Sequence, residues 1–132
     1  MKMKIKMILV LSMMMLGLAL TGCNTYTEHG HGTIMISNNL SDNAFLSFST
    51  FEGTKVFKLK VKSGDKINYS GSLGTGSATV YYDNGEGKKE LFTMSDGDSV
   101  EDSLENLEKG TVYIILETDG KAENGKVEFV VE

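Results

Sequence analysis

The chain has 132 residues, of which 13 are basic and 18 are acidic, so its formal net charge is −5. It contains one cysteine, no proline, no tryptophan and no arginine. A single cysteine excludes an internal disulfide, the acidic balance argues against nucleic acid as a partner, and the lack of arginine excludes bidentate arginine clamps for phosphate.

The first 22 residues have the layout of a secretory signal peptide. Lys2, Lys4 and Lys6 precede an apolar run from Met7 to Leu20. This run is shorter than the roughly 20 apolar residues that a transmembrane helix needs. We therefore predict that residues 1–22 form a signal peptide that is removed on export.

The end of that segment, Leu20-Thr21-Gly22-Cys23, resembles the lipobox of bacterial lipoproteins. The resemblance implies that the thiol of Cys23 takes a diacylglycerol and that signal peptidase II cuts between Gly22 and Cys23. Lipidation would also account for an unpaired thiol in an exported protein. We expect a lipid-anchored protein on the extracytoplasmic face of the cell membrane.

Residues 23–32 continue the mature chain as a polar, glycine-containing segment without apolar periodicity. This composition predicts a flexible tether. His29 and His31 could hold a metal as a His-x-His pair, but two ligands without a third make a weak site, so the tether interpretation is favoured. We expect no cofactor.

From Thr33 onward, apolar residues recur with period two, which is the pattern of strands with one buried face. In the clearest case, residues 56–62, Phe57, Leu59 and Val61 point one way while the lysines between them point the other. The same alternation predicts strands at residues 33–37, 44–51, 66–70, 77–83, 88–94 and 111–118 and at the end of the chain, where Val127, Phe129 and Val131 share a face.

Turn residues such as Asp83-Asn84-Gly85 and Asp96-Gly97-Asp98 separate these runs. The stretch from Ser99 to Glu108 has apolar residues at helical spacing, but its neighbours also allow an edge strand, and we favour a strand or an irregular crossover. About eight short strands predict an all-β fold, a single jelly-roll-like β-sandwich over residues 33–132.

The segment from Phe51 to Val131 resembles the small β-sandwich domain of Gram-positive lipoproteins, which is similar to carbohydrate-binding-module-like and pre-peptidase C-terminal folds. The resemblance is carried by Phe51-Glu52-Gly53, Phe57 to Ile67 (FKLKVKSGDKI), Lys109 to Ile114 (KGTVYI) and the closing run from Gly120. These are turn and core residues, so what the resemblance implies is a fold and not an activity.

We expect no enzyme activity, because both histidines precede the predicted sandwich and leave no base for a nucleophile inside it. A calcium ion is the better-motivated metal, since Asp83, Glu86, Asp96 and Asp98 lie in predicted turns whose oxygens could converge. The alternative is that these carboxylates serve their own turns, and we favour it.

For a glycan ligand, the candidate platforms are Tyr69, Tyr81 and Tyr113, because a tyrosine offers a flat apolar ring and a polar tip. Tyrosines in such domains more commonly lie half-buried in the core or at the end of the barrel. The sequence thus predicts a membrane-anchored, non-catalytic binding or accessory module that contacts an envelope protein, with binding of cell-wall or exopolysaccharide as the alternative.

Overall fold

A computed structural model describes residues 26–132 of the chain. The strands are β1 (His29–Thr33), β2 (Ile36–Asn39), β3 (Asn43–Val61), β4 (Ile67–Thr75), β5 (Ala78–Asp83), β6 (Lys89–Met94), β7 (Ser99–Leu104), β8 (Gly110–Thr118) and β9 (Ala122–Val131). All strand pairs are antiparallel. Within the described residues no helix is long and apolar enough to cross a membrane.

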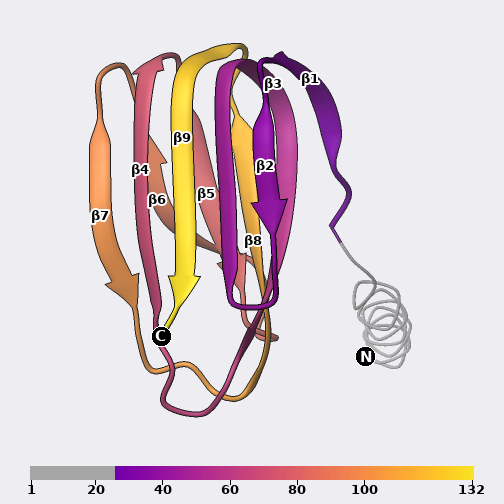
Figure 1. The fold of residues 1–132 in the computed structure, drawn as a ribbon, viewed down its shortest axis with the longest axis vertical. Coiled ribbons are helices and arrows are strands. Elements are labelled where there is room, and N and C mark those ends of the chain that lie inside the picture. The colour runs from indigo at the N-terminus through magenta and orange to yellow at the C-terminus, as the bar shows by residue number, and fades with distance from the viewer. Residues whose placement is uncertain (1–25) are drawn as a thin grey trace, which may run out of the picture.

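The strands form two facing layers that share the long strand β3 (Figure 1). Its first half pairs with β9 and β2, its second half pairs with β8, and β1 pairs with residues 50–54 at the bend between the halves. We call β7-β4-β9-β3-β2 the front sheet and β6-β5-β8-β3 the back sheet. This arrangement confirms the predicted all-β sandwich.

The bend in β3 lies where two glycines face each other. Gly53 in β3 pairs with Gly30 in β1, and both have positive φ, 142° and 124°. A Cβ atom on either glycine would overlap the backbone of the other strand, so only glycine fits at both positions. The chain can therefore turn from one sheet to the other without losing its pairing. For this reason residues 44–51 and 56–62, predicted as two strands, are one.

The core fills the space between the sheets with the inward side chains of the period-two pattern. Phe57 of the back sheet and Phe129 of the front sheet are both buried, with ring centroids 6.0 Å apart. Leu46, Leu59 and Ile114 are fully buried beside them. Each such side chain stabilises the fold by roughly 1.5–3 kcal/mol.

The amino-terminal strands differ from the sequence-based expectation. Residues His29 to Gly32 were assigned to a flexible tether, whereas in the structure they form β1 and pair with β3. The strand expected at 33–37 begins later, at Ile36. Glycines and histidines give β1 no apolar alternation, so its pairing partner, and not its own composition, makes it a strand.

The stretch from Ser99 to Glu108 divides into two parts. Its first part is β7, the edge strand of the front sheet, which confirms the preference for a strand. The chain then leaves the sheet, and Asn106 adopts a left-handed φ of 61°. This turn lets Leu107 reach the core, where it is buried.

Candidate functional site

The outer face of the front sheet carries many small polar side chains. Residues paired across neighbouring strands project to the same side, so the register defines rows across the sheet. The central row is Glu101, Ser70, Glu128, Phe45 and Asn38. The flanking rows are Ser99, Ser72, Lys126, Ser47 and Ile36, and Ser103, Asn68, Val130 and Asn43. Hydroxyl, amide and carboxylate groups therefore alternate over one exposed surface.

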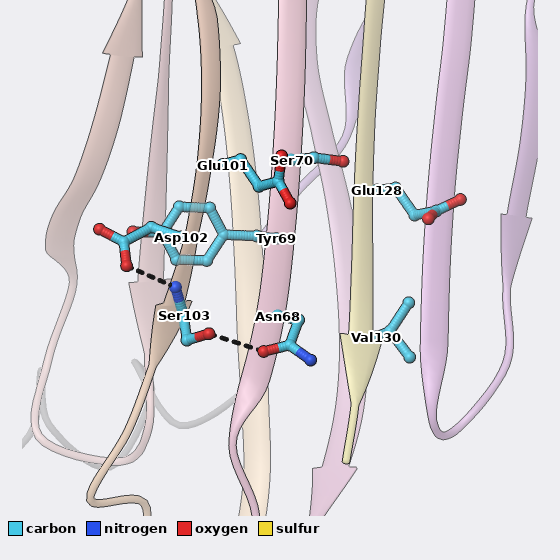
Figure 2. A pocket seen from close by; sticks show the side chains of 8 residues that line it. All are labelled: Asn68, Tyr69, Ser70, Glu101, Asp102, Ser103, Glu128 and Val130. Carbon is cyan, nitrogen blue, oxygen red and sulfur yellow. Dashed lines mark hydrogen bonds between the residues drawn. The ribbon is translucent and has the colours of Figure 1, made fainter.

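This face is hollowed over β7, β4 and β9, where a depression of 610 Å³ lies among the side chains (Figure 2). Its lining includes Asn68, Ser70, Glu101, Ser103, Glu128 and Val130. A smaller depression continues it toward Ser72, Ser99 and Lys126. We call the two together the polar groove.

Hydrogen bonds fix the lower end of the polar groove. The Ser103 hydroxyl donates to Oδ1 of Asn68 at 2.6 Å (Figure 2). The Asn68 amide nitrogen in turn donates to Oε2 of Glu132 at 2.6 Å. Asn68 is thereby held in one orientation before any ligand arrives, which lowers the entropy lost on binding.

An aromatic ring borders the polar groove on its β3 side. Phe45 lies directly across from Glu128 in β9 and from Asn38 in β2, and its neighbours Ala44 and Leu46 point into the core. Phe45 is therefore half-buried and turned outward. Val130 lies one diagonal step away on the same face, so an apolar strip adjoins the polar groove.

The charges in the polar groove are not neutralised by one another. Glu101 and Glu128 flank Ser70, and Lys126 lies in the next row. Within residues 26–132, none of these three charged side chains takes part in an ion pair. Both carboxylates remain available as hydrogen-bond acceptors for a ligand.

The three tyrosines predicted as platforms are not brought together. Tyr69 points into the core, where it is only 8% exposed and stacks on Phe92 with centroids 5.2 Å apart and an interplanar angle of 5°. Burial, followed by the charge of Asp102, raises the pKa of Tyr69. Its place in the strand alternation makes it a core residue, and it also contributes to the lining of the polar groove from below (Figure 2).

Tyr81 and Tyr113 lie on the outer face of the back sheet, opposite the polar groove. The Lys88 ammonium lies 4.2 Å from the centroid of the Tyr81 ring. Tyr113 is covered by Tyr26, whose ring meets it edge to face at 5.8 Å. Both rings are thus engaged by other parts of the chain and do not form an open platform with Tyr69.

The carboxylates considered for calcium lie at opposite ends of the β5–β6 hairpin. Asp83 accepts backbone N–H bonds from Gly85 and Gly87 in its own turn. Glu86 pairs there with Lys89 at 3.1 Å. At the other end, Asp96 accepts from Gly76, and Asp98 accepts from Ser95. Their oxygens do not converge, because Asp83 and Glu86 lie before β6 and Asp96 and Asp98 lie beyond its far end.

His29 and His31 belong to β1, and both side chains are exposed. The only hydrogen bond that the structure gives either ring joins His29 Nε2 and the Thr54 hydroxyl at 3.2 Å. In the described part of the chain, no group of three or more histidine, cysteine or acidic side chains could hold a metal ion. The lipidation and cleavage residues, Cys23 and Gly22, lie outside the described residues.

Comparison with protein-family models gives no match, and neither does comparison with curated proteins. Among solved structures, the carbohydrate-binding module TmCBM61, in complex with β-1,4-galactotriose, matches with a TM-score of 0.51 and 12% identity over 83% of this chain and 88% of that one. The fold is that of a carbohydrate-binding-module-like β-sandwich. The likeness expected from the sequence is thereby confirmed at the level of fold.

Two other solved structures match with lower scores. PliG of Aeromonas hydrophila, a periplasmic inhibitor of g-type lysozyme, has a TM-score of 0.48 and 10% identity over 70% of this chain and 88% of that one. The pre-peptidase C-terminal domain of a Bacillus anthracis collagenase has a TM-score of 0.46 and 19% identity over 83% of this chain and 100% of that one.

Sequence reasoning missed Phe45 and the polar row beside it. Two signals were present: Phe45 alternates with the inward residues Ala44 and Leu46, and Asn68 and Ser70 alternate with the buried residues of β4. What the sequence did not contain was the strand order that places β7, β4, β9 and β3 side by side.

Proposed function

We propose that this chain is a lipid-anchored, non-catalytic binding module that holds a glycan chain in the polar groove of its front sheet. The observation that carries the proposal is the row Glu101, Ser70, Glu128 and Phe45, which joins hydroxyl and carboxylate groups to an outward aromatic ring.

Sugars present two kinds of surface, and the front face offers a partner for each. Their hydroxyl groups both donate and accept hydrogen bonds, as do the side chains of Asn68 and Ser70, while Glu101 and Glu128 accept. Their C–H faces are apolar and pack on aromatic rings such as Phe45. An open groove, and not an enclosed pocket, suits a polymer that extends past the site in both directions.

Two further points support the proposal. The chain shares its fold with a carbohydrate-binding module whose structure holds a galactotriose, although that likeness concerns the fold alone. The lipobox-like sequence ending in Cys23 would place the module on the extracytoplasmic side of the membrane, where wall glycans and exopolysaccharides are found.

The test is binding of the full chain, purified in detergent, to isolated wall polysaccharide and to an array of defined oligosaccharides. We expect Phe45→Ala to lose binding while its circular dichroism spectrum stays unchanged, because the ring is half-buried and outside the core. The matched control is Thr79→Ala, which removes a side chain from the outer face of the back sheet. Equal binding by both variants would place the ligand elsewhere, and failure of the unaltered chain to bind any glycan would exclude the proposal.

A second candidate is a protein partner, and a different observation favours it. Four large apolar side chains are exposed along the β1–β2 edge: Ile34 at 76%, Ile36 at 61%, Leu40 at 54% and Met35 at 38%. Exposed apolar groups in proximity are typical of protein contact sites. A photocrosslinking residue at Ile36, compared with one at Ser103 in intact cells, tests this candidate, because only the Ile36 position should capture one defined protein.

A further inference from the structure

The segment that begins the described chain is fixed to the back sheet at several points. The Tyr26 hydroxyl donates to Oδ2 of Asp83 at 2.6 Å, and its ring packs on Tyr113. Glu28 Oε1 accepts from the Val56 amide at 3.0 Å, and β1 follows directly. From Tyr26 onward the chain is therefore part of the sandwich.

The outer face of the back sheet beside this attachment is itself partly buried. Ile115 points to the same side as Tyr113, away from the cluster of core residues between the sheets, yet it is only 1% exposed. Its cross-strand partners on that face are Tyr81 and Val56. A buried side chain outside the core shows that this face is closely packed, so Tyr26 packs on a rigid surface.

Chain geometry limits how far Cys23 can lie from the back sheet. Cys23 precedes Tyr26 by three residues, and three residues span at most about 11 Å when fully extended. The two sheets of a sandwich pack about 10 Å apart, and side chains extend beyond each. A lipidated Cys23 thus reaches lipid from the back sheet far more readily than from the front face.

We infer that docking of Tyr26 holds the module with the outer face of its back sheet toward the lipid headgroups and its polar groove facing away from the membrane. The inference rests on the proposed lipidation of Cys23. It assigns the back sheet as a membrane-apposed surface and leaves the polar groove open to a polymer above the bilayer.

The two faces differ in charge, because the back-sheet side is balanced and the polar groove is acidic. On the back-sheet side, three lysines are matched by acidic partners in the ion pairs Lys55–Glu28, Lys88–Glu117 and Lys89–Glu86. Lys58 and Lys60 add exposed positive charge there, and the carboxylates of Asp83 and Glu90 on the same face offset it. In the polar groove, Glu101 and Glu128 outnumber Lys126. An anionic lipid surface attracts lysines and repels acidic groups within a Debye length, so it opposes the inverted orientation.

The test uses the lipidated full chain, purified from bacterial membranes and reconstituted in phosphatidylglycerol–phosphatidylcholine vesicles that contain a lipid with a nitroxide on its headgroup. A fluorophore is attached to Thr79→Cys on the back face or to Ser72→Cys on the front face, since Cys23 is blocked by its lipid. We expect the nitroxide to quench the Thr79→Cys label and to leave the Ser72→Cys label unquenched. Equal quenching of the two labels, or stronger quenching at position 72, would overturn the inference.

A linker control separates the role of Tyr26 docking from that of the anchor. About 20 glycine and serine residues inserted between Asn24 and Thr25 span about 25 Å on average, which frees the module to rotate. The difference in quenching between the two labels should then be lost. Persistence of the difference would assign the orientation to something other than the short connection. If the chain does not float with the vesicles at all, the proposed anchor fails, and the inference fails with it.

Discussion

The hydroxyl of Tyr26 donates a 2.6 Å hydrogen bond to Oδ2 of Asp83, which lies 57 positions further along the chain. The other oxygen of Asp83 accepts the amides of Gly85 and Gly87, so one carboxylate both shapes the β5–β6 turn and holds the amino-terminal segment. Burial alone would raise the pKa of Asp83, but these hydrogen bonds, together with the charge of Lys89, lower it below its ordinary value.

Replacing Tyr26 by phenylalanine tests the strength of this link. Tyr26→Phe keeps the ring contact with Tyr113 and removes only the bond to the carboxylate. We expect the free energy of unfolding to fall by about 1 kcal/mol, since the bond involves a charged acceptor but is partly exposed to water. Urea denaturation measures the change. Tyr113→Phe, whose hydroxyl makes no hydrogen bond within residues 26–132, should leave stability unchanged; an equal loss in both variants would contradict the link.

The same link predicts a pH dependence. Burial, and then the hydrogen bond and charge of Asp83, raise the pKa of Tyr26 from 10.0 to about 12. Because the folded chain keeps this proton when the unfolded chain has lost it, the stabilisation is complete below pH 10 and is lost as the pH rises toward 12. Asp83 acts at the other end: its lowered pKa stabilises the fold above about pH 4, and this contribution is lost as the pH falls through the folded value.

The ionisation of Tyr26 at high pH can be measured from phenolate absorbance. The chain has five tyrosines, and Tyr26→Phe should remove a late-titrating one while leaving the earlier steps in place. The loss of stability above pH 10 should also be shallower in this variant. An unchanged titration curve at its alkaline end would show that Tyr26 ionises normally.

Gly125 is expected to tolerate no side chain. It faces the interior from β9, and a Cβ atom there would overlap the ring of Phe48, its cross-strand neighbour in β3. Overpacking of this kind costs about 1–3 kcal/mol, so Gly125→Ala should lower the urea midpoint. In the Phe48→Leu background, Gly125→Ala should lower the urea midpoint by less than it does in the unaltered chain. Additive losses in the double variant would show that the clash is not the cause.

Asn39 closes the side of the sandwich at which β2 ends. Its side-chain Oδ1 accepts the Lys58 amide, and its Nδ2 donates to the Lys58 carbonyl, both at 2.9 Å, as a paired strand would. Asn39→Ala should cost about 1 kcal/mol and speed hydrogen exchange at the Lys58 amide, which loses its partner. Asn38→Ala is the matched control, because Asn38 lies on the outer face and should leave that amide protected.

The sequence by itself determined the fold class and most of the strands. In β3 and β4, alternating apolar residues such as Phe57, Leu59 and Ile67 can bury one face only as strands, and glycine, asparagine and aspartate mark where the chain turns. The same alternation indicates that Phe45 points outward, although it did not identify Phe45 as part of a site. Period-two patterns are local, which is why they can be read without knowledge of the fold.

The tertiary structure alone decided the rest. Strand order places Ser70 between Glu101 and Glu128, sends Tyr69 into the core, and separates Asp83 from Asp96 by the length of a hairpin. It also makes a strand of β1, which has no apolar pattern of its own, because β3 offers a free edge for pairing. Such contacts join residues far apart in the chain, and the free energy that selects them comes from burial of both sheets at once, which no local stretch of sequence contains.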